Sequence, residues 1–183
     1  MDRTRLARLE ALFWPNEFVR DVWMVVDGAR DPQVYTHLRA SYMEYSCLYN
    51  GQLEPPLEEA APYLVRLEYQ NRYTRQLLEM AWGNSWGIVV ICDESLEKLR
   101  RHLRTLLVVR GPRGQQLVFR YYDPRVLRVY LPTCGAEDLR AVFGPVETFY
   151  VEDTNTDDLW EFRRDGPRLL RNKLSIAAAA TAR

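Results

Sequence analysis

The sequence predicts an α/β protein with a mixed sheet flanked by helices and a small C-terminal β-rich lobe. Apolar runs at residues 22–26 and 88–92 are typical of strands buried on both faces. Segments with a helical period of apolar residues alternate with strand patterns through the first two-thirds of the chain. We therefore expect an α/β domain over residues 1–150 and a short extension over residues 151–183, formed by a β-hairpin and a frayed tail.

The N-terminal third begins with a helix, expected over residues 6–13 because Leu and Phe recur there at helical spacing. The strand at residues 22–26 follows and ends at an Asp-Gly turn. Asp31, followed by proline, is a helix N-cap, and the apolar side of that helix extends to Tyr45. Residues 50–62 are acidic and rich in turn formers, which indicates a loop.

The middle of the chain repeats the alternation of strand and helix. We expect a strand at residues 63–67, a helix at 72–80 and a turn at 82–87 that leads into the strand at 88–92. Ser95 caps the next helix, in which leucines form one apolar stripe and arginines follow in the later turns.

The C-terminal third is expected to be mostly strand. Residues 117–122 alternate like a strand, a short helix is expected at 138–143, and strands follow at 146–151 and 159–163. The last of these turns into residues 169–173 as a hairpin.

Composition and charge exclude few classes of protein. Net charge is zero, with 25 basic and 25 acidic residues. Residues 98–128 hold nine basic residues and one acid, whereas residues 137–161 hold eight acids and one base. These segments are either two solvated faces or a footprint for a charged partner. We expect neither nucleic acid binding nor membrane insertion, since there is no global basic excess and no apolar segment of membrane-spanning length.

The three cysteines predict a reducing compartment. Cys47, Cys92 and Cys134 are far apart, no C-x-x-C motif occurs, and only His37 and His102 could complete a metal site. We therefore expect a cytoplasmic protein without structural zinc. Both histidines are expected on helix surfaces.

Three carboxylates raise the alternative of an enzyme. Asp27 and Asp93 each follow an apolar strand, and with Asp123 they could hold Mg²⁺ for phosphotransfer or hydrolysis. Each also has a local role as a turn or cap residue. The chain has no phosphate loop and no G-x-S-x-G nucleophile motif. The second alternative is a nucleic-acid module, because aromatic residues interleave with the arginines of the basic middle.

Six ordered motifs carry a resemblance to a known family. They are V-V-D-G-A at residues 25–29, A-P-Y-L-V-R-L at 61–67, W-G-N-S-W-G at 82–87, H-L-R at 102–104, F-R-Y-Y-D-P-R-V-L at 119–127 and F-G-P at 143–145. In this order they resemble the effector-chaperone, or adaptor, family of bacterial type VI secretion, the Tap/Tec family, long catalogued as a domain of unknown function. The resemblance spans about residues 23–150 and does not extend beyond residue 151.

The resemblance implies a non-catalytic adaptor without a cofactor. Such a protein binds a toxin effector in the donor cytoplasm and promotes its loading onto the VgrG spike. The motif residues to which the resemblance gives a structural role are Asp27, Gly28, Pro62, Trp82, Gly83, Trp86, Gly87, Arg120, Asp123, Pro124, Gly144 and Pro145.

The expected contact with the effector lies after residue 151, where such proteins vary. The edge of the C-terminal hairpin could pair with a strand of the effector, and the residues that we expect to contribute are Trp160, Phe162 and Leu169. For the signature at residues 119–127 two hypotheses stay open. Either Asp123 and Arg125 order the fold, with Arg125 or Arg120 paired to a buried acid such as Asp27, or the signature, including Tyr122 and Arg125, meets the effector or the spike.

Overall fold

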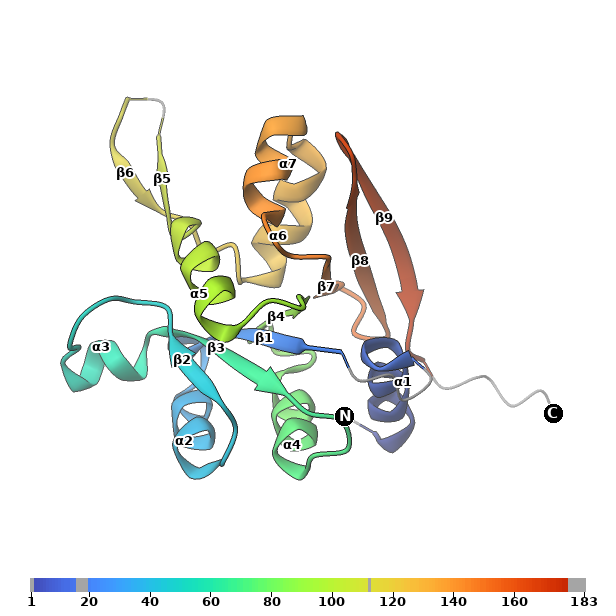
Figure 1. Cartoon of the computed structure of the whole chain (residues 1–183). Helices are drawn as coiled ribbons and strands as arrows, with labels where there is room; N and C mark the ends of the chain where they lie inside the picture. The colour runs from blue at the N-terminus through green and yellow to red at the C-terminus, as the bar shows by residue number, and fades with distance from the viewer. Residues whose placement is uncertain (1, 16–19, 112, 178–183) are drawn as a thin grey trace.

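The computed structural model describes residues 2–15, 20–111 and 113–177 of the chain. A seven-stranded sheet lies between two sets of helices, with α1, α2 and α4 on one face and α5, α6 and α7 on the other (Figure 1). The α/β class and the flanking helices that the sequence predicts are therefore confirmed.

The sheet is antiparallel throughout the described residues, not mixed. Its strands are β1 (Val22–Asp27), β2 (Tyr45–Cys47), β3 (Pro62–Leu67), β4 (Gly87–Ile91), β7 (Thr148–Glu152), β8 (Asp158–Asp165) and β9 (Arg168–Ser175), in the spatial order β2-β3-β1-β4-β7-β8-β9. Every pair of neighbouring strands in it is antiparallel. Apolar residues run continuously along β1 and β4 because helices cover both faces of the sheet. Antiparallel strands can be covered on both faces just as parallel strands can.

Capping residues start most of the helices. The helices are α1 (Arg3–Phe13), α2 (Pro32–Ala40), α3 (Pro55–Glu59), α4 (Arg72–Ala81), α5 (Leu96–Thr105), α6 (Pro124–Tyr130) and α7 (Ala136–Phe143), with short 3₁₀ turns η2 (Gly28–Arg30) and η3 (Leu131–Thr133). Asp31 caps α2 and Ser95 caps α5, as predicted. Asn71 caps α4 by accepting hydrogen bonds from two backbone N–H groups.

Each face of the sheet has its own hydrophobic core. One core joins Leu9 and Phe13 of α1 and Leu77 of α4 to alternate residues of the sheet. The other joins the predicted leucine stripe of α5, including Leu99 and Leu103, to the opposite set of strand residues. Both layers are therefore built by period-two strands against amphipathic helices.

Two predicted elements end earlier than expected, and one predicted loop contains a helix. The helix after Asp31 ends at Ala40, and Tyr45 belongs to β2. The strand predicted at residues 117–122 is only β6 (Gln116–Val118), because the chain then turns into α6. The loop at residues 50–62 contains the short helix α3, whose first two residues are prolines.

The predicted C-terminal hairpin is present as β8 and β9 and continues the main sheet through β7. The frayed tail falls mainly on residues 178–183, which lie outside the described residues. Ile176, where that tail was expected to begin, is fully buried in the core below the sheet. A separate hairpin, β5 (Val108–Arg110) with β6, projects from the body of the molecule (Figure 1).

Candidate functional site

Three of the six sequence motifs, at residues 25–29, 61–67 and 82–87, meet at one end of the sheet. Antiparallel register places Asp27 opposite Pro62, and Val26 opposite Gly87. The register of β4 with β7 brings Glu152 to the same end. We call this region the motif end, formed by the C-terminal ends of β1 and β7 and the N-terminal ends of β3 and β4.

Asp27 is the buried acid of the motif end. It is 1% exposed, and its Oδ1 accepts a hydrogen bond of 3.1 Å from the backbone N–H of Ala29. Its Oδ2 lies 3.9 Å from a guanidinium nitrogen of Arg120, and no hydrogen-bond partner for that oxygen exists among the described residues. Burial raises the pKa of this carboxyl group. The predicted pairing of Arg120 with Asp27 is therefore present, as a long ion pair.

The signature at residues 119–127 holds a helix start and not a strand. Tyr121 and Tyr122 are both buried, with their rings 5.5 Å apart edge to face. Asp123 caps α6, and its carboxylate accepts hydrogen bonds of 2.9 and 2.6 Å from the Arg125 guanidinium. Burial alone would raise the pKa of Asp123, but these hydrogen bonds outweigh it and lower the pKa. The Asp-Pro pair thus starts α6, and residues 119–122 belong to no strand.

Glu152 fixes the turn at residues 82–87. Its carboxylate accepts hydrogen bonds of 2.8 Å from the Gly83 backbone N–H and 2.9 Å from the Ser85 hydroxyl. Gly87 cannot carry a side chain here, since a Cβ would lie 2.0 Å from the Val25 carbonyl oxygen. Sequence reasoning missed Glu152, because no local pattern reveals which acid lies across the sheet from the turn.

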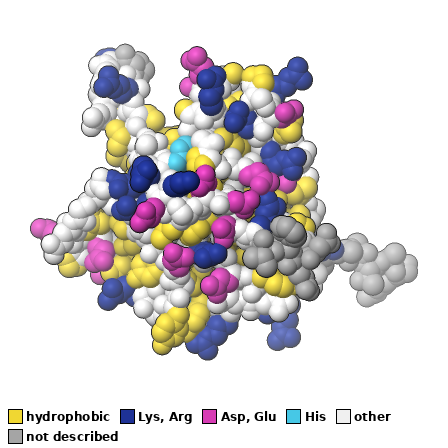
Figure 2. All heavy atoms as spheres, viewed as in Figure 1, with side chains coloured by type: hydrophobic (Ala, Val, Ile, Leu, Met, Phe, Trp, Pro, Cys, Tyr) yellow, Lys and Arg dark blue, Asp and Glu magenta, His cyan; other side chains and the backbone are white. Residues whose placement is uncertain are grey.

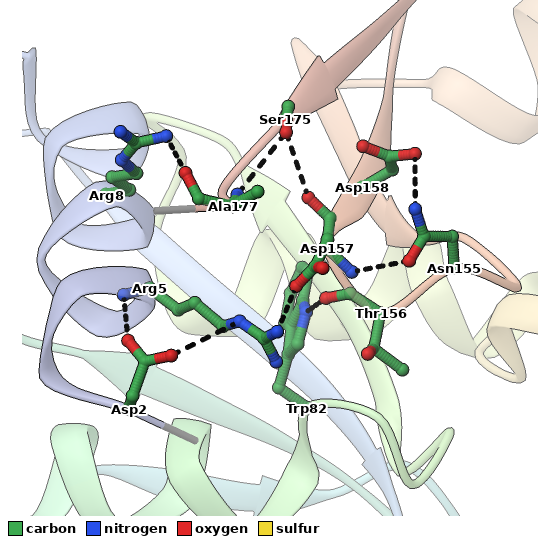
Figure 3. A network of polar contacts seen from close by, with 10 residues as sticks. All are labelled: Asp2, Arg5, Arg8, Trp82, Asn155, Thr156, Asp157, Asp158, Ser175 and Ala177. Atoms are coloured by element: carbon green, nitrogen blue, oxygen red, sulfur yellow. Dashed lines mark hydrogen bonds and ion pairs between the residues drawn. The ribbon is translucent and has the colours of Figure 1, made fainter. Parts of the chain in front are cut away.

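A polar network joins this turn to the N-terminal helix (Figure 3). The Trp82 indole donates a hydrogen bond of 3.1 Å to the Thr156 carbonyl in the loop between β7 and β8. The neighbouring Asp157 forms an ion pair with Arg5 of α1, and Arg8 of α1 donates to the Ala177 carbonyl after β9. The network therefore ties both ends of the described chain to the motif end.

The three carboxylates of the alternative metal site do not converge. Since β1 and β4 run antiparallel, Val22 faces Ile91, and Asp93 lies beyond the start of β1. Asp27 lies at the other end of that strand. Asp93 is exposed, and Ser95 instead caps α5. Among the described residues no group of His, Cys, Asp or Glu side chains could hold a metal ion.

The last motif, F-G-P, pairs with the H-L-R motif away from the motif end. His102 is half-buried, and its Nε2 lies 2.9 Å from the Val142 carbonyl oxygen. Gly144 follows α7 directly beneath that imidazole ring. Burial lowers the pKa of His102. His102 is therefore only partly on the helix surface, because α7 packs against its ring, and His37 of α2 is likewise half-buried, with its Nε2 3.1 Å from the Tyr73 carbonyl oxygen.

The residues expected to contact a partner differ in accessibility. Trp160 and Phe162 stack with ring centroids 6.1 Å apart, but Phe162 is buried in the core while Trp160 is half-buried. Leu169 is also half-buried against that core. Tyr122 is buried, and Arg125 is exposed while bound to Asp123. Trp160, Leu169 and Arg125 are thus the members of the set that reach the surface.

Sequence reasoning also missed the apolar surface of β5 and β6. Val108, Val109, Leu117 and Val118 are all exposed on this hairpin. Their alternation predicts a strand, but the sequence gives no signal that these residues stay exposed. Only the tertiary structure reveals that, within the part of the chain it describes, no helix or further strand covers the hairpin.

These features define a three-layer α/β protein whose motif residues are mostly engaged in joining its own elements. Residues 22–141 match the family model described as a domain of unknown function, DUF4123, and the chain belongs to this family. The matched region contains five of the six motifs, and the F-G-P motif and the β8–β9 hairpin follow it. The chain has no match among curated proteins or among solved structures. No helix of the described residues is both long and apolar enough to span a bilayer.

Proposed function

We propose that this protein is a non-catalytic adaptor that binds a type VI secretion toxin effector in the donor cytoplasm and promotes its loading onto the VgrG spike. The observation that carries the proposal is strand β9. It is one of the two outermost strands of the seven-stranded sheet and lies beyond the region that the family model matches. An edge strand outside the matched scaffold suits a protein that binds its own particular cargo.

The free edge of β9 offers backbone groups for strand pairing. β8 and β9 are joined by a two-residue turn, with Asp165 opposite Arg168. In such hairpins the pair flanking the turn exchanges hydrogen bonds, and the next residues alternate. Leu169, Arg171 and Lys173 therefore direct their backbone N–H and C=O groups to the open edge.

The side chains along this edge favour an acidic strand as the cargo segment. Arg168 and Arg171 are exposed on β9, and the guanidinium of Arg171 lies 6.0 Å from the Trp160 ring centroid. The ammonium nitrogen of Lys173 lies 2.8 Å from a carboxylate oxygen of Asp153, so the charge of Lys173 is largely neutralised within the chain. Basic residues on an edge strand disfavour self-association and select a partner of opposite charge.

The internal use of the polar motif residues supports a non-catalytic role. Asp123 and Glu152 are buried and accept hydrogen bonds from their own chain. Asp27 is buried beneath Arg120. Each of these carboxylates thus has a structural partner, and an adaptor requires no reactive group beyond them.

The test is affinity purification of the tagged full-length protein from the native bacterium, with the co-purified proteins identified. We expect a toxin and a VgrG spike protein. Arg171→Pro removes one outward N–H on an edge strand, where proline is tolerated, and should abolish toxin recovery. Arg171→Ala separates the two contributions of this residue, because it removes the basic side chain and keeps the N–H group, and it should weaken toxin recovery without abolishing it.

Recovery of neither toxin nor spike would refute the proposed function. Recovery of the toxin with Arg171→Pro at the wild-type level would refute the role of β9. Truncation after Val151 is not a usable test, since Leu159, Phe162 and Ile176 are core residues and their loss would unfold the protein.

A further inference from the structure

The β5–β6 hairpin projects from the body of the molecule at the end of α5 (Figure 1). It is a separate two-stranded sheet, and its strands pair with each other alone. An isolated two-stranded hairpin is marginally stable in water. Apolar residues that stay exposed on such a hairpin therefore favour a partner that covers them.

Both faces of the hairpin are apolar near its base. Val108 lies opposite Val118 on one face, and Val109 lies opposite Leu117 on the other. Val108 is 51% exposed and Val118 is 69% exposed. Single exposed apolar residues are ordinary on a protein surface, but here an exposed apolar pair lies on each face of a projecting element.

One face of the hairpin borders a hollow of about 270 Å³ at its base. Val108 and Val118 line it from the hairpin, and Leu48 and Leu107 line it from the body. Arg104 of α5 lies on its rim. The hollow is therefore an apolar depression beside a cation, large enough for an apolar side chain of a partner.

Basic side chains lie beside the hollow. Arg104 lines it, and the guanidinium of Arg100 donates a hydrogen bond of 3.3 Å to the carbonyl of Tyr49, another lining residue. Arg110 follows Val108 by two positions and so shares its face of the ribbon. Among the described residues neither Arg104 nor Arg110 forms an ion pair, as the ion pairs of the chain lie elsewhere. In Figure 2 the projecting hairpin carries basic and apolar side chains and no acidic one.

We propose that this hairpin is a second docking surface, which binds an extended, acidic segment of a protein partner with an apolar side chain in the hollow. Carboxylates of the segment would pair with Arg104 and Arg110, and its backbone would extend the two-stranded sheet. A second copy of this chain fits poorly, because identical hairpins would bring like charges together. The surface is distinct from strand β9 and does not depend on the cargo that β9 binds.

The probe is a fluorescently labelled peptide in which leucine alternates with aspartate, measured by anisotropy against the full-length protein. A second peptide with lysine in place of aspartate controls for the charge. We expect the acidic peptide to bind about tenfold more tightly than the basic one, and added salt to weaken it. Val118→Ser and Arg110→Gln should each weaken binding about tenfold.

Val129→Ser is the matched control, because Val129 is 66% exposed on α6 and should leave binding unchanged. All these side chains are exposed, so the melting temperatures should match that of the wild type. Equal binding of the two peptides, or wild-type binding by Val118→Ser, would overturn the proposal. A concentration-dependent dimer that Val118→Ser abolishes would overturn it in favour of self-association. The peptides replace the toxin here, so failure of this test leaves the adaptor proposal standing.

Discussion

Replacing Gly144 by alanine tests whether the F-G-P and H-L-R motifs act as one packing unit. Gly144 has a φ of 50° and a ψ of −115°, a conformation that side chains rarely adopt. A Cβ built there would lie 2.3 Å from Cε1 and 2.5 Å from Nδ1 of His102. The imidazole ring would have to move, and its hydrogen bond to the Val142 carbonyl would be lost.

The expected loss of stability in Gly144→Ala is the sum of two contributions. Backbone strain costs about 1–3 kcal/mol, and displacing the packed ring costs about another 1–3 kcal/mol. We therefore expect Gly144→Ala to lower the free energy of unfolding by roughly 2–6 kcal/mol. For a chain of this length the melting temperature should fall by roughly 10 °C. Urea unfolding followed by circular dichroism measures the free energy of unfolding, and a thermal scan measures the melting temperature.

Gly114→Ala is the matched control. Gly114 also has a positive φ, 78°, but a Cβ there would meet no atom within 4 Å. Gly114→Ala should lower the free energy of unfolding by the backbone strain alone, about 1 kcal/mol. Adding His102→Ala to Gly144→Ala removes the steric partner, and the double-mutant cycle should return a coupling energy of about 1–2 kcal/mol. The reasoning is refuted if Gly144→Ala costs no more than Gly114→Ala, or if the cycle shows no coupling.

Three further predictions concern the core, the signature and the pH dependence of stability. Phe162→Ala should lower the free energy of unfolding, measured in urea, by about 3–5 kcal/mol, because Phe162 is buried. Trp160→Ala should lower it by less than half as much, because Trp160 is half-exposed. Equal losses in the two variants would contradict this. Asp123→Ala should cost about 1–2 kcal/mol through loss of the α6 cap. Arg125→Ala separates the two hypotheses for the signature: a lower melting temperature supports a role in the fold, and lost partner binding at an unchanged melting temperature supports the interface. The folded-state pKa of His102 lies below its ordinary value of 6.5. The unfolded chain therefore binds more protons than the folded chain as the pH falls below about 6.5. The stabilisation that is present above about pH 6.5 is lost over that range. Melting temperatures at about pH 7.5 and about pH 5.5 should differ less in His102→Gln than in the wild type, and an identical difference in both would refute this.

The buried carboxylates Asp123 and Glu152 have structural roles that must be considered when their mutations are interpreted. Loss of Glu152 or Asp123 would disturb a turn or a helix start, and any effect on partner binding could follow from that disturbance. The exposed residues of β9 and of the β5–β6 hairpin are better positions for separating binding from folding, because their side chains contact little of the core.

Local patterns determined much of the fold. The caps Asp31 and Ser95, the leucine stripe of α5 and the apolar runs of β1 and β4 are all where the sequence predicts them. Such features depend on residues within a few positions of each other, so one sequence is enough to find them. The hairpin of β8 and β9 was found for the same reason.

The tertiary structure alone decided the direction of the strands and what each face contacts. An apolar run shows that both faces are covered but not which way the neighbouring strand runs, so the sequence predicted a mixed sheet and placed Asp93 near Asp27. Glu152 reaches the turn at residues 82–87 across the sheet, about seventy residues away in sequence. The exposure of β5 and β6 depends likewise on the absence of a covering element. Contacts between distant segments are set by how the chain packs, and no local spacing records them.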